Sequence, residues 1–149
     1  MEPTDITTYE ALVLQSRAGR ILKTIMQPIL RNYDLTMMQW SVIGHIHTAG
    51  KKGIRISDLA DQIDTSLAFI TNSVNALEAK DLVYRVGHES DNRAKMVCIN
   101  PEFRRKISKI EKELRERLSE TLGAQIKLEH ISIYLEVLRQ IAELDLRMQ

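Results

Sequence analysis

Few residues in this 149-residue chain are of the types that carry out catalysis or bind metals, and their spacing does not bring them together. Cys98 is the only cysteine, and a lone cysteine in a strand is expected to be a packing residue. His45 and His47 are two positions apart, which on a helix directs their side chains away from each other, so they cannot share a metal. The sequence has no glycine-rich phosphate loop, nucleophile elbow or carboxylate constellation. We therefore predict no metal, no cofactor and no enzymatic activity.

Small and polar side chains that suit contact with nucleic acid cluster over residues 65–75. A helix capped by Thr65 or Ser66 and running to about Lys80 fits this stretch. Its apolar positions at helical spacing are Ile70, Val74 and Leu77. The outer face then carries the predicted DNA contacts, which are Thr65, Ser66, Ala68, Thr71, Asn72 and Asn75. The two asparagines are the better base readers, because an amide can bond an adenine edge bidentately. The alternative interpretation is a merely solvated polar face.

Asp91 and Arg93 form a second candidate contact, in a polar segment over residues 88–94 that suits the tip of a β-hairpin. An arginine at such a tip can enter the DNA minor groove, where a narrow A·T-rich groove concentrates negative potential. The aspartate would hold the guanidinium in a defined direction through a charge-assisted bond. Arg85 and Lys95 on the flanking strands are the predicted phosphate partners. The alternative for the Asp91–Arg93 pair is a surface ion pair, which contributes ~0–1 kcal/mol.

The elements that position these residues follow from apolar periodicity and from capping residues. Helices are predicted over 8–33, over 35–49 with Thr36 as cap, over 57–63 with a cap at or beside Ser57, over 66–80, from Asn100–Pro101 to about 122, and over 128–146. Extended pieces are predicted over 54–56, 82–87 and 95–99. The order is a helix-turn-helix followed by a β-ribbon, the winged-helix arrangement. The predicted fold class is mainly α with a small β-wing, flanked by N- and C-terminal dimerisation helices.

Several short motifs occur in a fixed order over residues 35–100: LTMMQW at 35–40, ISDLA at 56–60, LEAK at 77–80, LVYR at 82–85 and DNR at 91–93. Their order and spacing resemble the MarR (multiple-antibiotic-resistance) family of small dimeric winged-helix transcription factors. The resemblance implies sequence-specific binding of double-stranded DNA and a minor-groove role for Asp91 and Arg93. Three residues depart from the family pattern: Asn72 stands where many members carry a basic residue, and Asp81 and Phe103 replace frequent glycines. An aspartate tolerates the left-handed backbone better than most residues, so the turn at Asp81 is expected to survive.

The sequence length suits a single domain over 1–149, with a winged helix-turn-helix over 35–100 and dimerisation helices over 8–33 and 101–147. The outer helices carry more apolar surface than so small a domain can cover, which predicts a homodimer acting on a pseudo-palindromic operator. The net charge is only +1, and residues 36–100 carry as many acidic as basic side chains, so DNA affinity must come from a few well-placed cations. The polar N-terminus and the absence of a long apolar stretch predict a cytoplasmic protein with no membrane partner.

A small aromatic or phenolic effector is a further expectation from the resemblance. Arg17, Trp40 and His45 are predicted to line its cleft, because apolar walls with one arginine suit an aromatic carboxylate. Ordinary packing where helices meet is the alternative for each of these residues. Two alternatives to DNA-dependent regulation also remain, namely a winged-helix module that binds only protein and a helical protein that binds a small molecule.

Overall fold

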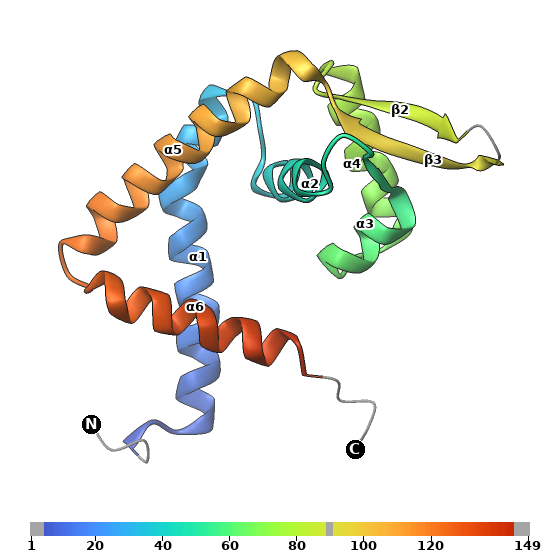
Figure 1. Cartoon of the computed structure of the whole chain (residues 1–149). Coiled ribbons are helices and arrows are strands. Elements are labelled where there is room, and N and C mark those ends of the chain that lie inside the picture. Colours follow the sequence, from blue (N-terminus) through green and yellow to red (C-terminus); the bar gives the residue numbers. More distant parts are fainter. Residues whose placement is uncertain (1–4, 89–90, 145–149) are drawn as a thin grey trace.

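The computed structural model describes residues 5–88 and 91–144, and the side chains of His88 and of residues 91–94 lie outside this description. The elements in chain order are α1 (Thr8–Asn32), α2 (Met37–Thr48), β1 (Ile54–Arg55), α3 (Ile56–Ile63), α4 (Leu67–Ala79), β2 (Val83–His88), β3 (Asp91–Ile99), α5 (Pro101–Gly123) and α6 (Leu128–Ala142). Helices α1, α5 and α6 lie on one side of the molecule, and α2–α4 with the β-hairpin lie on the other (Figure 1). The mainly α fold with a small β-wing is confirmed.

Side-chain caps start most of the helices at the predicted places. Thr36 and Gln39 form a complete capping box at the start of α2, and the Asn100 side chain accepts from the Glu102 amide at the start of α5. The prediction of a cap at or beside Ser57 is wrong. Helix α3 begins at Ile56 and its N-cap position is Arg55, which makes no side-chain capping bond. The reason is tertiary, because pairing of β1 with β3 already fixes the backbone that enters α3.

The strands form an antiparallel sheet in the order β1-β3-β2, so β3 is the central strand. Ile54 pairs with Val97 and Tyr84 pairs with Cys98. The hairpin is longer than predicted, since β2 extends to His88 and β3 begins at Asp91, with a register shift between Val86 and His88. Residues 91–94, predicted as part of the hairpin tip, therefore belong to a strand. The packing role predicted for Cys98 is confirmed, as its side chain is buried beside Lys51.

A single apolar core joins the winged helix to the long helices. Leu30 of α1, Ile43 and Ile46 of α2, Leu59 of α3 and Ile110 of α5 are fully buried in it. Phe103, the departure from the family pattern in α5, is buried in the same core. No polar or charged side chain is buried among the described residues. Burial of this core fixes α4 and the hairpin relative to α1 and α5, so the candidate site sits on a rigid support.

Left-handed aspartates end several helices. Asp34 follows α1, Asp64 follows α3 and Asp81 follows α4, with φ angles of 55°, 58° and 58°. The expectation that an aspartate can make the turn at position 81 is therefore confirmed. Lys80, the C-cap of α4, also bonds the Asp34 carbonyl (2.5 Å), which ties the end of α4 to the turn between α1 and α2.

Helix α6 is shorter than predicted and has no buried residue. It ends at Ala142 instead of extending to residue 146, and residues 145–149 lie outside the described part of the chain. Apolar side chains stay exposed along both terminal helices, including Tyr9, Leu12 and Val13 of α1 and Leu128, Ile133 and Ile141 of α6. Within the described residues, no helix is long and apolar enough to cross a membrane.

Candidate nucleic-acid interface

Helix α4 has one buried face and one exposed face, as the periodicity predicts. Ile70, Val74 and Leu77 have no exposed surface and anchor the helix in the core. Ala68, Asn72 and Asn75 are exposed on the opposite side, while Thr71 is half-buried at its edge. The structure therefore brings the predicted outer-face residues together along one exposed helix surface.

The hydroxyl groups of Ser66 and Thr71, two of the predicted DNA contacts, already have partners. The Ser66 hydroxyl caps α4 by accepting from the Phe69 amide (3.2 Å), which confirms Ser66 as the cap in preference to Thr65. The Thr71 hydroxyl donates to the Leu67 carbonyl one turn earlier (2.9 Å). Both groups keep acceptor capacity for another donor, but their first bonds go to the helix itself.

The two asparagines differ in how free their side chains are. Asn72 makes no side-chain hydrogen bond to any residue that the structure describes. The Oδ1 atom of Asn75 accepts from Nη2 of Arg85 in β2 at 2.6 Å. Arg85 is also paired with Glu78 of α4, with Nη1 and Oε2 3.7 Å apart. Arg85 was expected to be a phosphate partner, yet in the free protein its side chain is only 24% exposed and is held against α4.

The hairpin carries the other predicted contacts. Lys95 is exposed on β3, where its ammonium is free to meet a phosphate. Asp91 and Arg93 are in the same strand near the tip of the hairpin, which extends away from the helices (Figure 1). Their side chains lie outside the described residues, so the Asp91–Arg93 ion pair stays a prediction.

Two exposed apolar residues of α4 were missed by the sequence reasoning. Leu67 is 56% exposed and Phe69 is 42% exposed, both in the first turn of the helix. Phe69 falls off the spacing of Ile70, Val74 and Leu77, and that mismatch is the signal that could have found it. Leu67 lies three residues before Ile70, on the same spacing, so periodicity predicts it as a core position. Apolar side chains at the start of a helix in the major groove can contact the methyl group of thymine.

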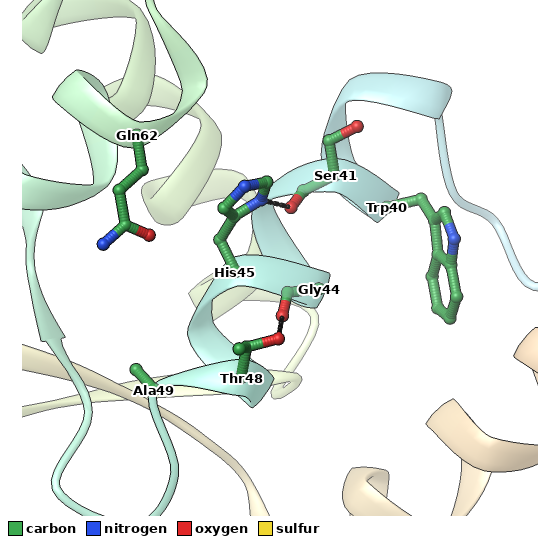
Figure 2. Close-up of a pocket in the computed structure, with 7 residues that line it drawn as sticks. All are labelled: Trp40, Ser41, Gly44, His45, Thr48, Ala49 and Gln62. Atoms are coloured by element: carbon green, nitrogen blue, oxygen red, sulfur yellow. Dashed lines mark hydrogen bonds between the residues drawn. The ribbon is translucent and has the colours of Figure 1, made fainter. Parts of the chain in front are cut away.

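A separate open pocket of about 590 Å³ lies between α2 and α3. Trp40 and His45 line it, together with Gln62 of α3 (Figure 2). The pocket lies within the winged helix, whereas the cleft predicted for these residues was expected between the winged helix and the long helices. The Nδ1 atom of His45 donates to the Ser41 carbonyl (2.7 Å), which leaves Nε2 on the other edge of the ring as an acceptor in the neutral form. Arg17, the third predicted residue, is exposed on α1 and does not line this pocket, because α1 packs mainly along α5.

No group of histidine, cysteine and carboxylate side chains that could hold a metal ion occurs among the described residues.

A family model described as the MarR family matches residues 33–94, which cover α2 through the start of β3. Over these residues the chain is similar to the MarR family. Its relative YhbI, an uncharacterized HTH-type transcriptional regulator of Bacillus subtilis (strain 168), is 29% identical over 105 residues, which is 70% of this chain and 67% of YhbI.

Solved structures of MarR-family regulators share the fold. One from Rhodococcus sp. RHA1 superposes with a TM-score of 0.83 at 18% identity, covering 94% of this chain and 97% of its own. Sco3205 from Streptomyces coelicolor, solved in complex with DNA, gives 0.77 at 19% identity and covers 95% and 91% of the two chains. CouR from Rhodococcus jostii RHA1, solved with p-coumaroyl-CoA, gives 0.76 at 21% identity over 89% and 91%. At these identities the likeness establishes the winged-helix fold of the chain.

Proposed function

We propose that this chain is a transcriptional regulator of the MarR type and that it binds a pseudo-palindromic operator in double-stranded DNA as a homodimer, with α4 of each subunit in the major groove. The observation that carries the proposal is the division of α4 into a fully buried apolar face and an exposed face bearing Ala68, Asn72 and Asn75. A helix whose buried face is packed against the rest of the domain can present the side chains of its exposed face to base edges. That Sco3205 was solved with DNA on the same fold supports this placement.

The hairpin is proposed to act as the wing that follows the adjacent minor groove. Its strands leave the domain as a two-stranded ribbon beyond the β1 pairing, which ends at Arg55 and Met96. Arg93 would enter the minor groove, and Asp91 would direct its guanidinium. Lys95, which is exposed on β3, would neutralise a neighbouring phosphate.

The homodimer is proposed from the unburied apolar faces of the terminal helices. Leu12 is 73% exposed in α1 and Leu128 is 67% exposed in α6, and further aliphatic side chains continue both stripes. Exposed apolar area of this extent marks an interaction surface. A second copy of the chain supplies the complementary surface under a two-fold axis, and that symmetry matches an operator made of two inverted half-sites.

The direct test is selection of bound fragments from random double-stranded DNA with the purified full chain. The proposal predicts an enriched inverted repeat whose half-site centres lie about one or two helical turns apart, roughly 10–21 bp. If the protein binds DNA fragments but no sequence is enriched among them, sequence-specific regulation is contradicted. Enrichment of a single half-site only would contradict the dimeric mode of binding.

An aromatic acid is the proposed effector class, and the α2–α3 pocket is its proposed site. His45 and Gln62 offer polar groups, and Trp40 lies at the edge of the pocket with its indole turned away from them (Figure 2). The p-coumaroyl-CoA bound to CouR supports this class. Trp40 is the only tryptophan of the chain, so all tryptophan fluorescence comes from a residue at this pocket. Titration with p-coumarate or 4-hydroxybenzoate should change the Trp40 emission in the wild type and much less in His45→Ala, and unchanged emission up to millimolar ligand would contradict the assignment.

A further inference from the structure

The contact between α4 and β2 gives Arg85 a role different from that of a phosphate ligand. The Asn75 Oδ1 atom lies 2.6 Å from Arg85 Nη2. The guanidinium of an arginine has only N–H donors and no acceptor atom. The amide atom that faces Arg85 must therefore be the oxygen, and the NH₂ group of Asn75 must occupy the other position. A charge-assisted bond of this length fixes the amide more firmly than solvent contacts would.

Glu78 holds Arg85 in the position that makes this bond. Its Oε2 atom lies 3.7 Å from Arg85 Nη1, one helical turn beyond Asn75 on α4. The guanidinium is thereby partly neutralised and turned toward α4, and only 24% of the side chain is exposed. An amino group of a base that approached the Asn75 oxygen would therefore meet the positively charged guanidinium of Arg85 beside it.

We propose that Arg85 is a positioning residue that makes Asn75 a hydrogen-bond donor toward DNA, and that Asn75 therefore selects a base with a keto oxygen. In the major groove guanine presents O6 and N7 and thymine presents O4, which are all acceptors, whereas cytosine presents an amino group and adenine presents an amino group beside its N7 acceptor. Bidentate reading of adenine needs the amide oxygen to accept from the adenine amino group, and one of the two lone pairs of that oxygen already accepts from the charged Arg85. The sequence-based expectation of adenine reading then applies to Asn72 and not to Asn75.

This inference rests on the proposed placement of α4 in the major groove, and the experiment separates the two. Random-DNA selections are performed with the wild type, Asn75→Ala, Arg85→Met and Arg85→Lys. The operator position that loses its preference in Asn75→Ala is the one that Asn75 reads. The wild type should favour guanine or thymine over adenine or cytosine there, on one strand, by on the order of tenfold. Arg85→Met frees the amide to flip, so this ratio should fall close to one.

Arg85→Lys keeps a donor beside Asn75 and should restore most of the keto preference, which a merely structural role would not explain. Lys95→Met is the matched control for charge, since it removes an exposed wing cation and should weaken binding without changing the preference at that position. Thermal unfolding verifies that each variant is folded. If Arg85→Met is unfolded, the Arg85→Lys and Asn75→Ala selections still measure the preference.

Several results would overturn the inference. They are an unchanged base ratio in folded Arg85→Met, a wild-type preference for adenine or cytosine at the Asn75 position, and equal loss of preference in Arg85→Lys and Arg85→Met. Absence of any enriched sequence in the wild type would overturn the proposed function and the inference with it. If an operator is enriched and the base pair that Asn75 reads shows one of the three results above, the inference is overturned and the proposed function is not.

Discussion

Single side chains of the same type take different roles on α4, and the difference comes from their neighbours. Asn72 is free of hydrogen bonds to described residues, whereas Asn75 is fixed by Arg85 from β2. A free amide can turn to match an adenine edge, and a fixed amide presents one group only. Base preference at this surface therefore depends on contacts between the helix and the hairpin as well as on the residues that touch DNA.

For substitution of Asp91 by alanine, a model based only on charge predicts tighter DNA binding, whereas a model in which Asp91 orients Arg93 predicts weaker binding. Arg93→Ala should weaken operator binding and lower the salt slope by about one unit, as expected when one phosphate equivalent is no longer neutralised. Asp91→Ala should also weaken binding, because the Arg93 guanidinium loses the group that directs it, even though a negative charge is removed. Binding isotherms over a range of salt concentrations measure both effects. Tighter binding by Asp91→Ala at every salt concentration would contradict the orientation model.

At the scale of elements, Gly53 allows β1 to approach β3 closely. Its φ of 77° is left-handed, and a Cβ there would clash with the Val97 carbonyl oxygen and lie 2.6 Å from Cys98 Sγ. Gly53→Ala should lower the free energy of unfolding by on the order of 3 kcal/mol, from backbone strain plus overpacking.

Gly50 provides the matched control, with a φ of 79° and no atom within 4 Å of an added Cβ. Gly50→Ala should lower the free energy of unfolding by only about 1–2 kcal/mol, since backbone strain alone applies. Urea unfolding of both variants gives the comparison. Equal losses in the two variants would show that the close approach of β1 to β3 contributes nothing.

The contact between α1 and α5 is expected to depend on pH. Tyr33 donates to Glu113 (2.6 Å), and this bond, with smaller effects from burial and from the Glu113 charge, raises the pKa of Tyr33 above its usual value. The folded state therefore holds this proton more firmly than the unfolded chain. The contribution to stability is complete below the unfolded pKa, near 10, and is lost as the pH rises through the folded pKa.

Tyr33→Phe removes this contribution at all pH values. The difference in urea midpoint between the wild type and Tyr33→Phe should be largest at pH 8 and should shrink above pH 10. A difference that is constant from pH 8 to pH 11 would contradict the assignment of this contact to the neutral phenol.

The extent to which sequence predicts these elements follows from how local their causes are. Helix faces and caps were predictable, because Ser66, Asn100 and the spacing of Ile70, Val74 and Leu77 act within a few residues. The start of α3 was not, since strand pairing between β1 and β3 replaces the side-chain cap. The Arg85–Asn75 bond joins residues ten positions apart on different elements, and no local pattern indicates it.

For the whole molecule, the exposed apolar faces of the terminal helices predict a dimer. We expect each chain to be stably folded only when it is associated with a second copy. Light scattering at micromolar concentration should give roughly twice the 17.1 kDa chain mass, because two apolar faces are covered only when two chains associate. Leu12→Glu in α1 should lower this mass or the thermal stability, whereas Arg104→Glu on α5, outside the apolar stripe, should change neither. A stable, fully folded monomer of the wild type would contradict the proposed dimer.

The central claim is that the exposed face of α4 reads DNA sequence, and Asn72 tests it most directly. Fluorescence anisotropy measures binding of the selected operator and of a scrambled duplex at one fixed salt concentration. Asn72→Ala should bind the operator more weakly by roughly 1–3 kcal/mol and bind the scrambled duplex as the wild type does. Asn32→Ala, which removes an exposed amide at the end of α1, is the control and should behave as the wild type. Wild-type discrimination between operator and scrambled DNA in both Asn72→Ala and Asn75→Ala would contradict the placement of α4 in the major groove.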